Sequence, residues 1–181
     1  MKYYLIISAI IIVAGCQPHT SKKNDQSADH RTMDMDERTM SDSAKQLLID
    51  ISNDAWFQVQ MANVILQKAH DTALLNLAQN TSRQYTRIKD RAKIVSIPYR
   101  LNIPYFLTHT QNATVDSIQA LGEREMKNEF VQQCNNNNQV ILQKCDAFES
   151  LVKNDSDILH FIDFSKNIVT NNGMQSQRMQ K

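Results

Sequence analysis

The chain has 181 residues, of which 41% are hydrophobic, and it contains only three glycines, three prolines and three cysteines. An all-β sandwich or barrel needs many more turn-forming glycines and prolines, so the composition argues against that class. The formal charge of +1 and the 7% of aromatic residues argue against a nucleic-acid binder, which needs a basic surface or a stacking platform. The length fits one domain with some additional sequence.

The first residues have the pattern of a secretory signal peptide. Lys2 supplies a positive charge, residues 3–13 form an apolar run, and two small residues precede Cys16. The run is too short to span a bilayer, which needs roughly 20 apolar residues. The ending resembles a bacterial lipobox, so we expect removal of residues 1–15 and acylation of Cys16. An ordinary signal peptide with a chance cysteine is the alternative.

Acylation of Cys16 predicts attachment to a membrane without a spanning segment. Two or more acyl chains anchor a protein stably, whereas one binds only marginally. The next residue is Gln17 rather than aspartate, which by resemblance to enterobacterial sorting favours the outer membrane, facing the periplasm. The predicted partner is therefore a membrane, reached through the lipid anchor, and an envelope protein or a lipid is a further candidate.

Residues 16–43 are polar and lack periodicity, which predicts a disordered tether. The tether contains thioether and imidazole side chains of the kind that suit Cu(I). They cluster, together with one carboxylate, at His30, Met33, Met35, Asp36 and Met40. A linker that binds no metal is the alternative, and the sequence favours it.

Beyond the tether, apolar residues recur every three or four positions, which predicts amphipathic helices. The expected helices cover about 44–69, 74–97, 112–121, 123–152 and 157–173. Pro98 and Pro104 predict a crossing loop over residues 97–110, and the last helix is expected to fray after Gly173. Residues 44–181 are therefore expected to form an all-α domain. Its predicted architecture is an antiparallel four-helix bundle of two hairpins, joined by the proline-containing loop.

Polar residues interrupt the predicted core of the third long helix. Asn138 stands between Cys134 and Ile141, and a buried amide must find hydrogen-bond partners. We predict that Asn138 bonds a polar side chain on another helix, with Tyr85 as the candidate. Cys134 and Cys145 lie about three turns apart on one helix, too far for a disulfide, and are expected to be buried free thiols.

The first helix is predicted to face the core with one apolar stripe. Its members are Leu48, Ile51, Ala55, Val59, Ala62, Leu66 and Ala69.

A basic stripe marks the second helix. Arg83, Arg87 and Arg91 share one face at four-residue spacing. This face is a candidate for contact with lipid phosphates or an acidic partner, and a solvated surface is the favoured alternative.

Catalytic signatures are missing from the sequence. It contains no nucleophile–base pair, no phosphate-binding glycine loop and no Cys-x-x-Cys motif. It also contains no Glu-x-x-His. The nearest pattern is Asp157-x-x-His160, in which Asp157 is expected to serve a helix N-terminus. We therefore expect no enzymatic activity, no cofactor and no internal metal site.

The stretch from Gln58 to Ala69, QVQMANVILQKA, resembles the first long helix of an exported bacterial family known as domain of unknown function 4142. The loop Asn102-Ile103-Pro104 and the glycine-led helix from Gly122 to Phe130 fit the same family, and the resemblance covers about residues 44–176. It implies a ferritin-like four-helix bundle, often a lipoprotein, with no established activity.

The departures from that family affect its ionisable positions. Members commonly carry Glu-Val-Glu in the first helix, Asp-His in the second and third, and a histidine in the fourth. The corresponding positions here are Gln58 and Gln60, Gln84 and Tyr85, Asn137 and Asn138, and Asn172 or Gln175. Amides and a phenol thus replace acids and histidines. We therefore predict a non-enzymatic structural or interaction module, and the alternative is a ferritin-like metal-binding or storage protein of the stress response.

Overall fold

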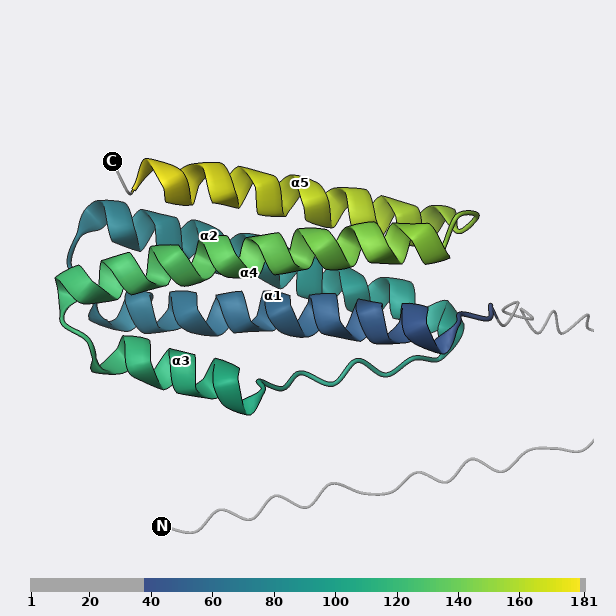
Figure 1. Cartoon of the computed structure of the whole chain (residues 1–181), viewed down its shortest axis with the longest axis horizontal. Coiled ribbons are helices and arrows are strands. Elements are labelled where there is room, and N and C mark those ends of the chain that lie inside the picture. Colours follow the sequence, from purple (N-terminus) through teal and green to yellow (C-terminus); the bar gives the residue numbers. More distant parts are fainter. Residues whose placement is uncertain (1–37, 180–181) are drawn as a thin grey trace, which may run out of the picture. The chain divides into compact units, whose positions relative to one another are not determined.

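The computed structural model describes residues 38–179, which are all-helical, as the sequence predicts (Figure 1). Within this range lie five α-helices and one short 3-10 helix: α1 (Asp42–Lys68), α2 (Thr72–Ser96), η1 (Ile97–Tyr99), α3 (His109–Ala120), α4 (Glu123–Leu151) and α5 (Ser156–Arg178). No strand occurs between residues 38 and 179. The predicted signal peptide, Cys16 and most of the predicted tether lie outside the described residues.

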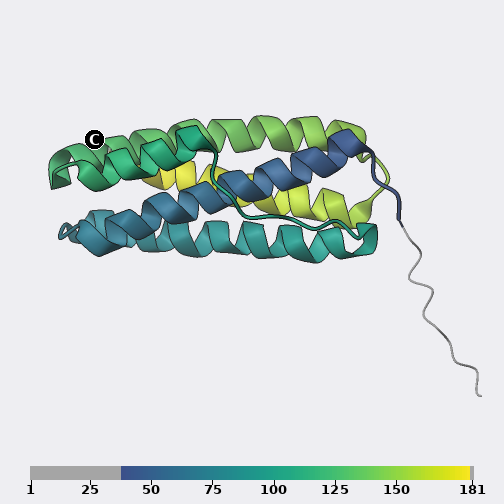
Figure 2. The same cartoon turned by 90° about the horizontal axis from the view of Figure 1, so that it is seen from below.

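The four long helices pack along one another. α1 packs against α2 and α4, while α5 packs against α4 and α2. The shorter α3 lies mainly on α1, with a smaller contact to α4. The segment of residues 100–108 leaves the end of α2 and runs back past α1 to reach α3 (Figure 2). Each pair of chain neighbours, α1 with α2 and α4 with α5, runs antiparallel (Figure 1).

Side-chain caps define where four of the helices begin. Ser41, Asp71, Thr108 and Asp155 each accept a hydrogen bond from the backbone N–H three residues later, over 2.9–3.3 Å. Such caps satisfy N–H groups that the first turn of a helix leaves without an internal partner. The short η1 is followed by Arg100, whose φ of 49° lies in the left-handed region and turns the chain away from α2.

Two element boundaries differ from the sequence-based expectation. The packed region begins before residue 44, because Ser41 caps α1 and Met40, 9% exposed, joins the hydrophobic core. At the other end, α5 continues through Gly173 to Arg178 instead of fraying. Buried Asn172 and Ser176 lie on either side of this glycine in α5, so tertiary packing offsets its low helix propensity.

The core stripe of α1 is broader than predicted. Leu66, assigned to the core from its spacing, is 39% exposed, whereas its neighbour Ile65 is fully buried. Phe57 and Met61 are buried as well. The physical reason is that α2, α3 and α4 all contact α1, so more than one face of this helix is covered.

Among residues 38–179, no helix combines the length and the hydropathy that a bilayer-spanning segment requires.

Candidate functional site

A layer of buried polar side chains crosses the interior, and all four long helices contribute to it. Each member is at most 4% exposed. The members are Gln58 on α1, Thr81 and Tyr85 on α2, Cys134 and Asn138 on α4, and Asn172 on α5. We call this group the amide layer.

Asn138 is the centre of the amide layer. Its Oδ1 accepts from the Tyr85 hydroxyl, which is the predicted pairing, and from Gln58 Nε2 over 3.3 Å. Its Nδ2 donates to Asn172 Oδ1 over 3.2 Å, and Asn172 Nδ2 in turn donates to Thr81 Oγ1 over 2.8 Å. The layer therefore joins four helices through one continuous hydrogen-bonded path.

Gln58 connects this path to the backbone of α4. Its Nε2 also donates to the Cys134 carbonyl over 3.1 Å, and its Oε1 accepts from Cys134 Sγ over 3.1 Å. The amide is thus satisfied on both its donor and its acceptor side, as a fully buried amide must be.

The amide layer carries no charge at neutral pH. Burial raises the pKa of the Tyr85 hydroxyl well above its usual value, and burial likewise raises the pKa of the Cys134 thiol. Both groups therefore stay protonated and act as hydrogen-bond donors. The remaining members are amides and a threonine hydroxyl, which do not titrate.

The donor set of the amide layer does not fit a ferritin-like metal site. Such a site uses carboxylates and Glu-x-x-His motifs that point inward from four helices. Here the oxygens of Gln58, Asn138 and Asn172 are neutral and already accept hydrogen bonds. A divalent ion would find no anionic ligand to offset the loss of its hydration. Between residues 38 and 179, no three His, Cys, Asp or Glu side chains gather closely enough to hold a metal ion.

A buried carboxylate, Asp54, forms a second polar cluster that the sequence did not reveal. It is 6% exposed, and its Oδ2 lies 2.6 Å from Lys144 Nζ. Gln111 on α3 donates to Asp54 Oδ1 over 3.2 Å, and Asn137 donates to the Asp54 carbonyl over 3.0 Å. Burial raises the pKa of Asp54, while the hydrogen bond and charge of Lys144 oppose that rise. The cluster joins α1, α3 and α4.

The three arginines of the predicted basic stripe have different contacts in the structure. All three arginines are exposed on α2, and Arg83 Nη2 donates to Asn80 Oδ1 over 2.9 Å. The guanidinium carbons of Arg87 and Arg91 instead lie 5.1 and 5.0 Å from the centre of the Phe164 ring on α5. These two cations border a groove of about 650 Å³ between α2 and α5. We call it the arginine groove, and Ile94, His160 and Asp157 also line it.

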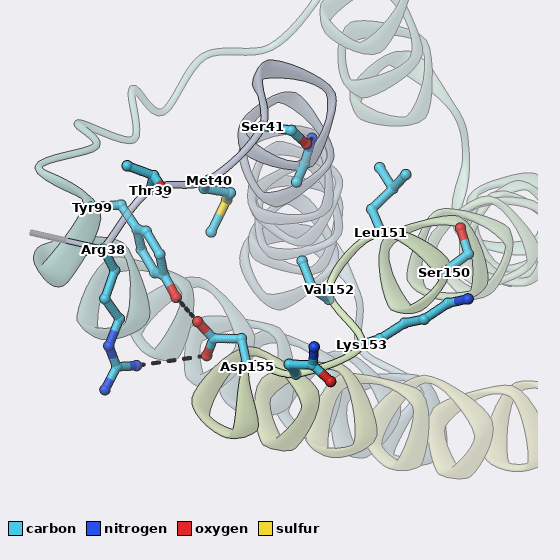
Figure 3. Close-up of a pocket in the computed structure, with 12 residues that line it drawn as sticks. Arg38, Thr39, Met40, Ser41, Tyr99, Ser150, Leu151, Val152, Lys153 and Asp155 are labelled. Carbon is cyan, nitrogen blue, oxygen red and sulfur yellow. Dashed lines mark hydrogen bonds and ion pairs between the residues drawn. The ribbon is translucent and has the colours of Figure 1, made fainter.

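Another pocket, of about 640 Å³, lies where the chain enters α1 and where α4 connects to α5 (Figure 3). Tyr99 donates a hydrogen bond to Asp155 Oδ2 at this pocket. Arg38 Nη1 lies 3.7 Å from Asp155 Oδ1 and 2.7 Å from Asp157 Oδ2. Residues that precede α1 are thereby held against the start of α5. The lining mixes the apolar side chains of Met40, Leu151 and Val152 with polar ones.

The other predicted sites fall partly outside residues 38–179. Cys16 does so, as do four members of the candidate copper group, His30, Met33, Met35 and Asp36. The fifth member, Met40, is part of the hydrophobic core. Cys134 and Cys145 are free and buried, as the helical spacing predicts.

Comparison of the chain with protein-family models, with curated proteins and with solved structures finds no match.

Proposed function

We propose that this protein is a lipid-anchored module of the bacterial envelope with a structural or interaction role and no enzymatic activity. Acylation of Cys16 after removal of residues 1–15 supplies the anchor, and the outer membrane, facing the periplasm, is the proposed location. The sequence around Cys16 supports the anchor, since small residues follow an apolar run and precede the cysteine.

The proposed architecture is a ferritin-like four-helix bundle, in which α1, α2, α4 and α5 form the bundle and α3 is an addition on α1. The contacts of these helices support that interpretation. The similarity to domain of unknown function 4142 belongs to the same proposal, and it implies a common scaffold. A scaffold alone does not transfer an activity.

The amide layer is the observation that best supports a structural role. Gln58, Tyr85 and Asn138 stand where the family resemblance implies an acid or a histidine, and Asn172 is one of two candidates for a further such position. All four side chains are buried and belong to one hydrogen-bonded network. A network whose members satisfy each other rigidifies a core and specifies its packing. The same residues have no charge with which to bind or activate a substrate.

The intact mass of the detergent-extracted protein tests the anchor. The expected mass is that of residues 16–181 plus a diacylglyceryl group and an amide-linked acyl chain. The Cys16→Ser variant is expected to lack this addition and to leave the membrane fraction if it is still cleaved after residue 15. A cleaved Cys16→Ser protein that stays in the membrane would contradict the anchor.

Metal analysis tests the structural role against the storage alternative. The purified protein is incubated with iron, manganese, zinc or copper, desalted and measured by elemental analysis. We expect no stoichiometric metal. Because Met40 is in the core and the other predicted copper ligands precede it, a His30→Ala/Met33→Leu/Met35→Leu/Asp36→Asn variant serves as control. Tight metal that survives in this variant would overturn the structural role in favour of a site within the helices.

A further inference from the structure

The end of α2 presents apolar side chains to solvent beside the arginine groove. Ile94, which lines the groove, is 65% exposed, and Ile97 at the start of η1 is 55% exposed. They are the two most exposed of the large hydrophobic side chains within residues 38–179. Exposed apolar groups that adjoin one another mark a contact surface more often than isolated ones do.

Two cations accompany these isoleucines on α2. Arg87 and Arg91 stack on Phe164, and this contact orients both guanidinium groups at the groove. In the part of the chain that the structure describes, no carboxylate forms an ion pair with either guanidinium. Two acids also line the groove, but Asp157 is 2.7 Å from Arg38 and Asp90 is 3.5 Å from Lys89. The pair of arginines is thus available for an external anion.

This surface lies next to the segment that precedes α1. Arg38, the first described residue, binds Asp157 of the groove itself. Only 21 residues separate Arg38 from Cys16, and even a fully extended segment of that length reaches at most about 75 Å. Because Arg38 contacts Asp157 of the groove, the chain that leads back to Cys16 joins the domain at the end that carries Ile94, Ile97 and the arginine groove.

We propose that the arginine groove, with Ile94 and Ile97, docks against an anionic phospholipid surface. Arg87 and Arg91 contact the lipid phosphates, and the two isoleucines insert among the headgroups. A cationic patch beside exposed apolar groups is the chemistry with which peripheral proteins bind the bilayer interface. The inference rests on the proposed lipid anchor for its biological setting, because the anchor holds this surface close to a membrane. The docking itself needs no acyl chain.

The test uses the mature chain, residues 16–181 with Cys16→Ser, made without a signal peptide so that no lipid is attached. It is sedimented with vesicles of phosphatidylcholine alone and with vesicles that also contain phosphatidylglycerol. We expect preferential partitioning onto the anionic vesicles, weakened by salt. Each arginine near an anionic leaflet contributes about fivefold, so Arg87→Gln/Arg91→Gln is expected to lower the partition coefficient roughly 25-fold.

A matched variant separates docking from a general charge effect. Arg124 is exposed in the first turn of α4, and Arg178 is exposed at the end of α5. The double variant Arg124→Gln/Arg178→Gln changes the net charge by the same amount as Arg87→Gln/Arg91→Gln. This control is expected to keep the partitioning of the parent chain. Ile94→Ser/Ile97→Ser is expected to lower it several-fold without changing the unfolding midpoint, since both side chains are exposed. Equal losses in the control and the groove variant would overturn the proposal.

Two further outcomes are decisive. Absence of any preference for anionic vesicles overturns the docking, and binding to polyglutamate without binding to vesicles would replace the bilayer with an acidic protein partner. The intact mass of the full-length protein decides the anchor separately. An acylated protein whose unlipidated chain ignores anionic vesicles would refute the docking alone. Vesicle binding by a chain that is never acylated would support the docking and refute the anchor.

Discussion

Asn138 on α4 donates a hydrogen bond to Asn172 on α5 over 3.2 Å, and both side chains are almost fully buried. Each amide also bonds a residue of α2, Tyr85 in one case and Thr81 in the other. A shift of α5 by one turn would leave these donors and acceptors without partners in a low-dielectric interior. We infer that the amide layer fixes the register of the helices, a role for which buried polar groups are well suited.

Asn138→Leu is expected to destabilise the protein. The exchange adds an apolar side chain of similar size but leaves the Tyr85 hydroxyl and Asn172 Oδ1 without their partners. Each orphaned buried group costs about 1–3 kcal/mol, so the expected loss in free energy of unfolding is about 3 kcal/mol. Urea denaturation followed by circular dichroism measures it.

Asn136→Leu is the matched control, because Asn136 is exposed on the same helix; its effect is expected to stay within about 0.5 kcal/mol. Tyr85→Phe provides a second check. It is expected to cost about 1 kcal/mol in the native protein but to restore about 1 kcal/mol in the Asn138→Leu background, where it removes a buried hydroxyl that lacks its acceptor. Equal stability of Asn138→Leu and the native protein would refute the network.

Lys144→Gln is expected to destabilise the protein more at neutral pH than at low pH. Lys144 opposes the rise that burial causes in the pKa of Asp54, so its removal raises that pKa further. The folded protein then binds a proton more readily than the unfolded chain, and its stability falls as the pH rises above about 4. At pH 7 we expect a loss of about 2 kcal/mol, less than for a fully buried pair because the Lys144 side chain is 26% exposed.

Lys166→Gln is the control for that experiment. The Lys166 side chain is 27% exposed, but its partners Asp146 and Glu149 are 71% and 48% exposed. Exposed ion pairs contribute at most about 1 kcal/mol. Urea midpoints at pH 7 and pH 4 therefore distinguish the two lysines, and a loss in Lys144→Gln that does not depend on pH would argue against a buried, ionised Asp54.

The sequence predicts the helices because their periodicity and caps are local properties. It also predicts the pairing of Asn138 with Tyr85, since an amide in an apolar stripe needs a partner and polar candidates on the other stripes are few. The remaining partners of Asn138, Gln58 and Asn172, depend on which helices lie side by side and at which register. Those relations are set by packing between distant segments, which periodicity does not encode.

Asp54 shows the same limitation more sharply. It lies beside Ala55 of the predicted stripe but is not part of that stripe. Its burial depends on the contacts of α1 with α3 and α4, and its cation lies 90 residues away on α4. The first helix begins at Asp42 instead of near residue 44, for a local reason. The run Ser41-Asp42-Ser43 is a cap-type signal, but Met40 stands among polar residues, so periodicity alone does not distinguish it from the tether.

Met40→Ala is expected to lower the free energy of unfolding by about 2 kcal/mol, because it removes a buried side chain from the core beside the start of α1. Met174→Ala is the control, since Met174 is 48% exposed on α5, and its effect is expected to be near zero. Thermal unfolding of both variants measures the difference. Identical midpoints would show that the segment before α1 does not contribute to the core.

Glu123→Gln is expected to weaken the protein at neutral pH and to have little effect near pH 3. Glu123 Oε1 accepts from the backbone N–H groups of His70 and Asp71 over 2.6 and 2.7 Å, which joins the start of α4 to the turn between α1 and α2. These two hydrogen bonds hold the pKa of Glu123 below its usual 4.5. Its contribution to stability is therefore fully present above about pH 4.5 and is lost as the pH falls through the lowered value.

The measurement for Glu123 is the urea midpoint of both proteins between about pH 3 and pH 7, with Glu125→Gln as the control. Glu125 occupies the same first turn of α4 and has the same favourable interaction with the helix dipole. The difference between native protein and Glu123→Gln should shrink as the pH falls, because protonation removes the charge from the native carboxylate as the substitution does. Asp71, whose pKa is also lowered, titrates in both proteins, so its contribution largely cancels. A difference that stays constant down to pH 3, or one that Glu125→Gln reproduces, would mean that the carboxylate charge does not strengthen this contact between α4 and the α1–α2 turn.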